Sequence, residues 1–170
     1  MINPKIFDDL PHDFNLFINI KKEDKIKAYN ILDQLHSKGI FLSLNKPAAN
    51  LKDVLERSDL KTNDLLFIDC VSKHVEEPLE IENCEYASLN LPDISLAITK
   101  ASEKIGHNVN KFLILDSLHD LLMYYDKETA LKFMKFLIER MRTLRINGIV
   151  LNAGEIPKEF LRLFDKVIEI

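Results

Sequence analysis

Short, unbroken runs of apolar residues alternate along this chain with longer segments in which apolar residues recur every three or four positions. An unbroken run is typical of a strand that is buried on both faces of a sheet, and the longer spacing is typical of a helix with one buried face. The runs predict strands over residues 14–20, 40–44, 64–71, 111–115, 149–152 and 166–170. Helices are expected between them, over residues 24–39, 50–57, 92–106, 127–145 and 157–164.

This alternation predicts the α/β fold class, as a three-layer α/β/α sandwich around a mainly parallel sheet. An acidic, irregular segment over residues 76–90 leaves room for an edge strand around residues 86–89, which could run antiparallel. No repeat, low-complexity tract or linker interrupts the pattern, so we expect a single domain over residues 1–170.

The first helix is expected to begin at Asp24, whose carboxylate can cap it, and to end at Gly39, where a C-terminal glycine is common. Its buried side would carry Ile26, Tyr29, Ile31, Leu32 and Leu35.

Composition narrows the class of protein. An apolar share of 46 % and a charged share of 29 % are those of a globular chain. The net charge of −4, with cations spread along the sequence, argues against a nucleic-acid-binding surface. No apolar run approaches the roughly 20 residues that cross a bilayer, and no signal peptide is visible, so no membrane partner is expected. Cys70 and Cys84 have no zinc-binding spacing, which favours reduced thiols in the cytoplasm.

Two aspartates are predicted at the carboxyl ends of buried strands, where α/β sheets bind ligands. Asp116 follows the apolar run 112–115, and Asp69 lies near the end of the third strand. They could share a crevice and form a weak metal site with His119 or Asp120 nearby. We favour a structural role, in which each carboxylate caps a neighbouring helix or pairs with a lysine, and we expect no metal.

The order of these elements, with the segments FLILDSL, LKFMKFLIERMR, GIVLN and LFDKVIEI, resembles the KaiC-like ATPases of the RecA superfamily, in particular the short archaeal KaiC-like domains. The resemblance implies a RecA-like sheet in which Asp116, followed by Ser117, matches the magnesium-linked Walker B aspartate. It also implies that IFLSLNKP corresponds to a segment in which two catalytic glutamates precede a proline.

The sequence departs from this family at the residues that hydrolysis requires. The phosphate-binding loop GxxxxGK[ST] needs glycines so that backbone N–H groups can approach the phosphates, and the stretch IKKEDKIKAYN contains none. Lys21, Lys22 and Lys25 stand in the position of that loop as a degenerate Walker A segment. Asn45 and Lys46 stand where the two glutamates would be, and neither can serve as a carboxylate base.

These losses predict a non-catalytic, regulatory or protein-binding module, in signal transduction, that needs no cofactor. The principal alternative is an enzyme that still binds Mg²⁺ or ATP through Asp116 with the help of a partner subunit. A lesser alternative is a receiver-like domain with Asp69 as phosphoacceptor, Glu23 and Asp24 as its acidic residues and Ser117 after the fourth strand. A thiol nucleophile at Cys70 with His74 is disfavoured because their spacing fixes no hydrogen bond.

One residue of the long helix is a candidate for partner contact. Phe136 falls outside the stripe of apolar residues that faces the sheet, on the side that holds Lys132 and Arg140. An aromatic side chain between basic residues is a reasonable hot spot for a protein partner, although a helix covered on two sides within its own domain is as reasonable. The partner could be another protein, a second copy, or an active relative.

Overall fold

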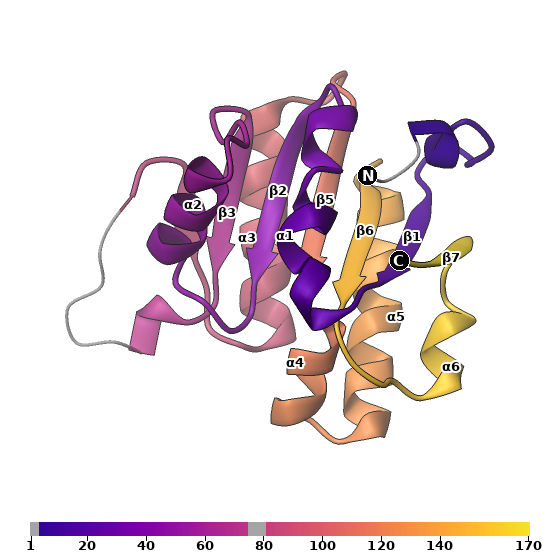
Figure 1. Ribbon diagram of the computed structural model, residues 1–170. Helices are drawn as coiled ribbons and strands as arrows, with labels where there is room; N and C mark the ends of the chain where they lie inside the picture. Colours follow the sequence, from indigo (N-terminus) through magenta and orange to yellow (C-terminus); the bar gives the residue numbers. More distant parts are fainter. Residues whose placement is uncertain (1–3, 75–80) are drawn as a thin grey trace.

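The computed structural model describes residues 4–74 and 81–170, and its described strands form a sheet of seven in the order β4-β3-β2-β5-β6-β1-β7 (Figure 1). The strands are β1 (Asn15–Asn19), β2 (Lys38–Ser43), β3 (Leu65–Asp69), β4 (Cys84–Tyr86), β5 (Lys111–Asp116), β6 (Asn147–Asn152) and β7 (Lys166–Glu169). Every neighbouring pair is parallel, which confirms the α/β prediction. The edge strand that could have been antiparallel is β4, and it runs parallel to β3.

Helices cover both faces of the sheet. They are α1 (Lys25–Tyr29), α2 (Ala48–Arg57), α3 (Leu91–Ile105), α4 (Leu118–Tyr124), α5 (Lys127–Thr143) and α6 (Lys158–Leu161). In the view of Figure 1, α1 and α2 lie in front of the sheet and α3 lies behind it. The helices α3 to α6 pack into one apolar cluster with Phe17, whereas α1 and α2 pack into a second cluster with Leu16 and Ile18. Because successive side chains of a strand point to opposite faces, β1 contributes side chains to both clusters.

The central strand β5 is buried along its whole length, as the apolar run predicted. It lies between β2 and β6, and β6 separates it from β1. The same strand order contradicts the receiver-like alternative. Receiver folds have the order 2-1-3-4-5, in which the first two strands are neighbours, whereas β5 and β6 separate β1 from β2 here.

The predicted helix over residues 24–39 is wrong in its extent. The chain forms a 3₁₀ turn η2 (Lys22–Asp24), the five-residue α1, and a second 3₁₀ turn η3 (Leu32–Gln34). Asp24 makes no capping hydrogen bond, and Ile26 is 53 % exposed. Gly39 lies within β2, where a side chain would begin 2.1 Å from the Phe112 ring. The Phe112 ring, which packs directly against the Gly39 backbone, and not the end of a helix, therefore requires this glycine.

A helix that the sequence pattern did not reveal, α4, follows β5 directly. It begins after Asp116 and Ser117, which are joined by a cis peptide bond, and it buries Leu118 and Leu121. At seven residues it is too short for its apolar spacing to stand out from the strand before it.

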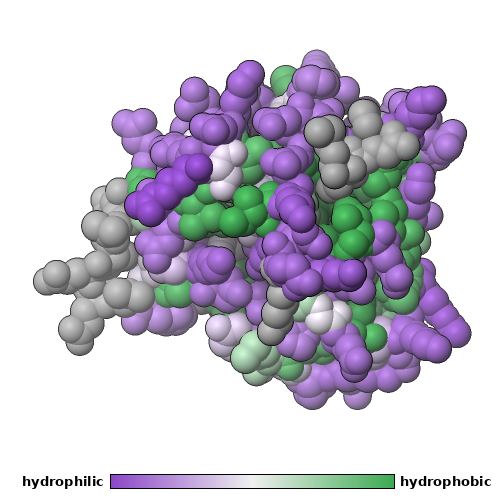
Figure 2. Space-filling model, viewed as in Figure 1, coloured by the Kyte–Doolittle hydropathy of each residue, from purple (hydrophilic) through white to green (hydrophobic). Residues whose placement is uncertain are grey.

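The face carrying α1 and α2 is largely hydrophilic, with smaller hydrophobic areas between the charged side chains (Figure 2). On other helices Leu96, Met123, Tyr124 and Phe136 are exposed. Among the described residues, we find no helix with the length and apolar character needed to span a membrane.

Candidate functional site

The carboxyl ends of the parallel strands gather polar side chains at one edge of the sheet. Asp116 ends β5 and lies beside Ser43 at the end of β2, which in turn lies beside Asp69 at the end of β3. Asn19 and Asn152 form the corresponding pair at the ends of β1 and β6. Sequence analysis expected the two aspartates at this edge, but it did not single out the two asparagines.

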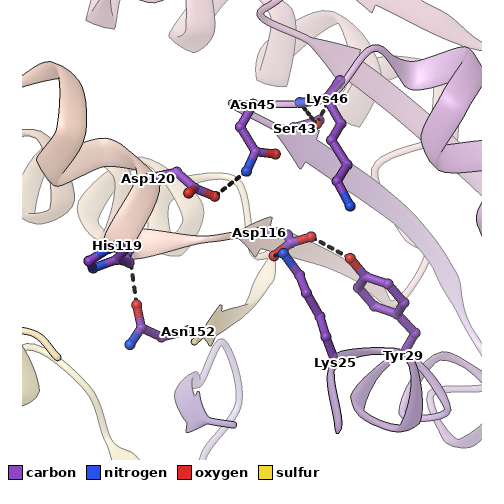
Figure 3. Close-up of polar contacts among 9 residues, drawn as sticks. All are labelled: Lys25, Tyr29, Ser43, Asn45, Lys46, Asp116, His119, Asp120 and Asn152. Carbon is purple, nitrogen blue, oxygen red and sulfur yellow. Dashed lines mark hydrogen bonds and ion pairs between the residues drawn. The ribbon is translucent and has the colours of Figure 1, made fainter. Parts of the chain in front are cut away.

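Asp116 is buried, and both of its carboxylate oxygens have partners from α1 (Figure 3). The Lys25 Nζ lies 2.7 Å from Oδ1, and the Tyr29 hydroxyl donates a hydrogen bond to Oδ2. The Lys25 side chain is 22 % exposed and that of Asp116 only 3 %. This arrangement is a mostly buried ion pair with an added hydrogen bond, and we call it the Asp116 cluster.

The phenol of Tyr29 acts in this cluster as a neutral donor. Burial raises the pKa of Tyr29 far above its ordinary value, and the charge of Asp116 and the hydrogen bond to it raise the pKa further. Tyr29 therefore keeps its proton wherever the protein is folded, and it can neither act as a base nor release Asp116 by ionising.

Asp69 is buried, and its carboxylate accepts hydrogen bonds from three main-chain N–H groups and one hydroxyl. Its Oδ2 accepts hydrogen bonds from the Ala48 N–H at 2.7 Å and from the Ser72 hydroxyl at 2.7 Å. Its Oδ1 accepts from the Val71 and Ser72 N–H groups, each at 2.8 Å. Ala48 is the first residue of α2, where Pro47 offers no side-chain cap. The carboxylate thus holds α2 and the turn after β3, and its oxygens are already occupied.

Asn45 and Lys46 lie in the loop between β2 and α2. Asn45 donates a hydrogen bond from Nδ2 to Asp120 on α4, so that it links this loop to the helix after Asp116. The Ser43 hydroxyl donates to the Lys46 carbonyl at 2.7 Å and fixes the turn. Figure 3 shows the Lys46 side chain extending from this loop toward the Asp116 cluster. The loop therefore adds an amide and a second cation to this edge, and no carboxylate.

A second polar group connects the neighbouring strands. Asn152 accepts from the His119 N–H at 2.9 Å, and its amide donates to Asn19 Oδ1 at 3.0 Å and to the Gly154 carbonyl at 2.8 Å. Gly154 has φ +141°, and a Cβ there would lie 3.1 Å from the His119 ring. The asparagine thus fixes the start of α4 against β6, and its place at a strand end was the signal that could have identified it.

The other candidate residues lie apart from this edge or have side chains with low reactivity. Lys21 is exposed. Burial raises the pKa of the Cys70 thiol to about 12, so the reactive thiolate is scarce at neutral pH. Within residues 4–74 and 81–170, no three His, Cys, Asp or Glu side chains are placed to hold a metal ion. Phe136 is 39 % exposed, and Arg140 donates to the Thr99 hydroxyl at 2.6 Å.

No protein-family model and no curated protein matches this sequence. Solved structures do resemble it in fold. A KaiC-like protein from the hyperthermophilic archaeon Pyrococcus horikoshii aligns over 94 % of this chain and 73 % of its own, at 17 % identity and TM-score 0.60. An uncharacterised protein from the same organism, in complex with an unknown peptide, aligns over 97 % of this chain and 80 % of its own, at 15 % identity and TM-score 0.70.

A third P. horikoshii protein aligns over 99 % of this chain and 88 % of its own, at 9 % identity and TM-score 0.62. At these identities the comparisons establish the fold and leave the activity open. The chain has a RecA-like α/β/α sandwich of the kind found in KaiC-like proteins.

Proposed function

We propose that this chain is a non-catalytic domain of the KaiC-like type that has lost nucleotide hydrolysis and acts in regulation by binding a protein segment. The observation that carries the first half of the proposal is the Asp116 cluster. Asp116 stands in the position of the magnesium-linked aspartate, and Lys25 and Tyr29 occupy its two oxygens.

In this proposal, the Lys25 ammonium occupies the place that a bound magnesium ion would take beside Asp116. Magnesium held by one carboxylate depends on substrate phosphates and water for its remaining ligands. Here the carboxylate is already neutralised by the Lys25 ammonium at 2.7 Å, and the first glycine of the chain is Gly39, after α1. A metal would have to displace an ion pair whose carboxylate is buried, without a glycine loop to contribute phosphate binding energy.

Two observations support the proposal that the chain binds a protein segment. One of the proteins with this fold was solved in complex with an unknown peptide. On α5 of this chain, Phe136 is 39 % exposed beside Arg140, and exposed aromatic and arginine side chains are enriched in protein interfaces. A peptide or a partner's loop that packs on this part of α5 would use the surface that the sequence pattern singled out.

Calorimetric titration with ATP and Mg²⁺ tests the loss of catalysis. We expect no binding heat at 100-fold excess of ATP over protein, and no phosphate release above the buffer rate. The Asp116→Asn variant provides the control, since any residual signal that belongs to a contaminating ATPase will persist in it. Saturable ATP binding that the wild type shows and Asp116→Asn loses would contradict the proposal and favour an enzyme.

Selection from a displayed peptide library tests protein binding. Enriched peptides should bind the wild type and lose at least tenfold in affinity for Phe136→Ser. Val167→Ser is a matched control, because Val167 is 40 % exposed and lies on β7. Peptides that bind both variants equally, or the absence of any enriched peptide, would count against α5 as the binding surface.

A further inference from the structure

A cavity lies at the end of the sheet opposite to Asp116, where the strands begin. It has a volume of about 300 Å³ and is bounded by the C-terminal turns of α3 and α5 and the loops that follow them. The side chains that matter for its chemistry are Ser102, Glu103, His107, Lys111 and Arg145. We call it the amino-end cavity. Because β5 spans Lys111–Asp116, about 17 Å of strand separates this cavity from the Asp116 cluster.

The feature that distinguishes this cavity is a buried lysine without a carboxylate. Lys111 is only 2 % exposed, and it makes no ion pair with any residue in the described ranges. Its ammonium donates to the Gly106 carbonyl at 2.7 Å, at the C-terminus of α3. Burying an unpaired charge is costly, and burial lowers the pKa of Lys111 accordingly. One carbonyl and the helix dipole offset part of this cost and leave two of the three N–H donors without a partner among the described residues.

Further donors line the same cavity. Arg145, at the start of the loop before β6, has φ +53° and makes no ion pair within the described part of the chain. The imidazole of His107 and the hydroxyl of Ser102, which is 5 % exposed, line the cavity as well. Glu103 is the carboxylate among these residues, and it is exposed and beyond ion-pair distance of Lys111 and Arg145. Among these five side chains there are thus two cations, Lys111 and Arg145, and one carboxylate.

We infer that the amino-end cavity binds a small anion that carries a phosphate group. An arginine, a lysine and a hydroxyl supply the charge-assisted hydrogen bonds that phosphate oxygens accept most strongly. A volume of about 300 Å³ is sufficient for a phosphate with a small organic group attached. The bound anion supplies the negative charge that Lys111 lacks. This site does not overlap the Asp116 cluster, and neither Phe136 nor Arg140 lines it.

The inference is tested by titrating ¹⁵N-labelled full-length protein with inorganic phosphate and, separately, with pyrophosphate, at constant ionic strength. We expect saturable shifts of amide signals from residues 102–111 and 143–146. Tighter binding of pyrophosphate would identify a diphosphate ligand, and tighter binding of phosphate a monophosphate. Vesicles containing phosphatidic acid form a further arm, and shifts with vesicles but not with free phosphate would identify a lipid headgroup as the source.

Two variants and a control localise the binding. Lys111→Met keeps the length of the side chain and removes its charge, and it should weaken binding at least tenfold. Arg145→Gln alters an exposed side chain, so this variant should fold, and it should weaken binding at least fivefold. It therefore tests anion binding even if Lys111→Met fails to fold. Lys135→Gln, on an exposed position of α5, should bind within twofold of the wild type. Non-saturable shifts with all three probes, or equal binding by Arg145→Gln, would overturn the inference.

Discussion

The ion pair between Lys25 and Asp116 makes a quantitative prediction about stability. Replacing Lys25 by Met removes the cation but leaves a carboxylate whose side chain is 3 % exposed. Breaking a buried ion pair from one side costs about 3–5 kcal/mol in the free energy of unfolding. Two features favour the lower end: Lys25 is 22 % exposed, so that water can reach the gap, and Tyr29 still donates to the carboxylate. We therefore expect a loss of about 3 kcal/mol for Lys25→Met.

A double-mutant cycle isolates the interaction energy between Lys25 and Asp116 from their interactions with other residues. Asp116→Asn leaves the Lys25 ammonium free to extend toward water and should cost about 1–2 kcal/mol. The double variant Lys25→Met with Asp116→Asn contains no buried charge at this position, and the amide that replaces the carboxylate can still accept from the Tyr29 hydroxyl. Its cost should be about 1 kcal/mol, so that the two single losses exceed the double loss by about 3–4 kcal/mol.

Urea unfolding followed by far-UV circular dichroism provides these values, since the chain contains no tryptophan. Lys27→Met is the matched control on the same helix, because Lys27 pairs with Asp24 at the surface, and its removal should not shift the unfolding midpoint measurably. A Lys25→Met variant as stable as Lys27→Met, or a double variant as unstable as the sum of the singles, would refute the buried ion pair.

Three further predictions concern other parts of the fold. Gly39→Ala should cost about 1–3 kcal/mol in urea unfolding, because its Cβ would begin 2.1 Å from the Phe112 ring, and an unchanged midpoint would show that the ring does not pack against Gly39. Asp69→Asn replaces an acceptor of four hydrogen bonds by an amide with two donors, and should cost about 2–4 kcal/mol by the same assay without altering peptide binding. Cys70 should react with a disulfide reagent at pH 8 far more slowly than in urea, since burial raises its pKa to about 12. The unfolded thiol ionises near pH 9 while the folded one does not, so the free energy of unfolding should fall by about 1.4 kcal/mol per pH unit above pH 9 from this group, and Cys70→Ala should abolish that part of the slope.

The sequence was sufficient to predict the parallel sheet, but not the contacts that the side chains at its edge make. The apolar run before Asp116 identified β5 as a central strand, because an unbroken apolar run has no exposed face in a parallel sheet. Parallel strands bring their carboxyl ends to one edge, so Asp69 and Asp116 could be placed there as well. The preferred interpretation, in which each carboxylate caps a neighbouring helix or pairs with a lysine, agrees with the hydrogen bonds of Asp69 and the ion pair of Asp116.

The identity of the partners could not be read from the sequence, because it depends on how the segment after β1 folds. A regular helix over residues 24–39 would have placed Tyr29 among aliphatic residues on one stripe. In the structure, Lys25 and Tyr29 lie four positions apart on α1 and both contact a strand end 87 positions beyond Tyr29 in the chain. Local spacing carries no information about such a contact, and short helical turns leave too few apolar positions to define a face.

The two ends of β5 differ in a way that bears on both proposals. Each end carries a buried charge, Asp116 at the carboxyl end and Lys111 at the amino end. The carboxylate has a cation and a hydroxyl from its own chain, whereas the ammonium has one backbone carbonyl and a cavity. A charge that is fully paired internally has little free energy to gain from a ligand, while a charge that is buried and unpaired gains from any anion that reaches it. The structure therefore directs the search for a small-molecule ligand away from the carboxyl edge, where open α/β sheets ordinarily bind their ligands, and toward Lys111.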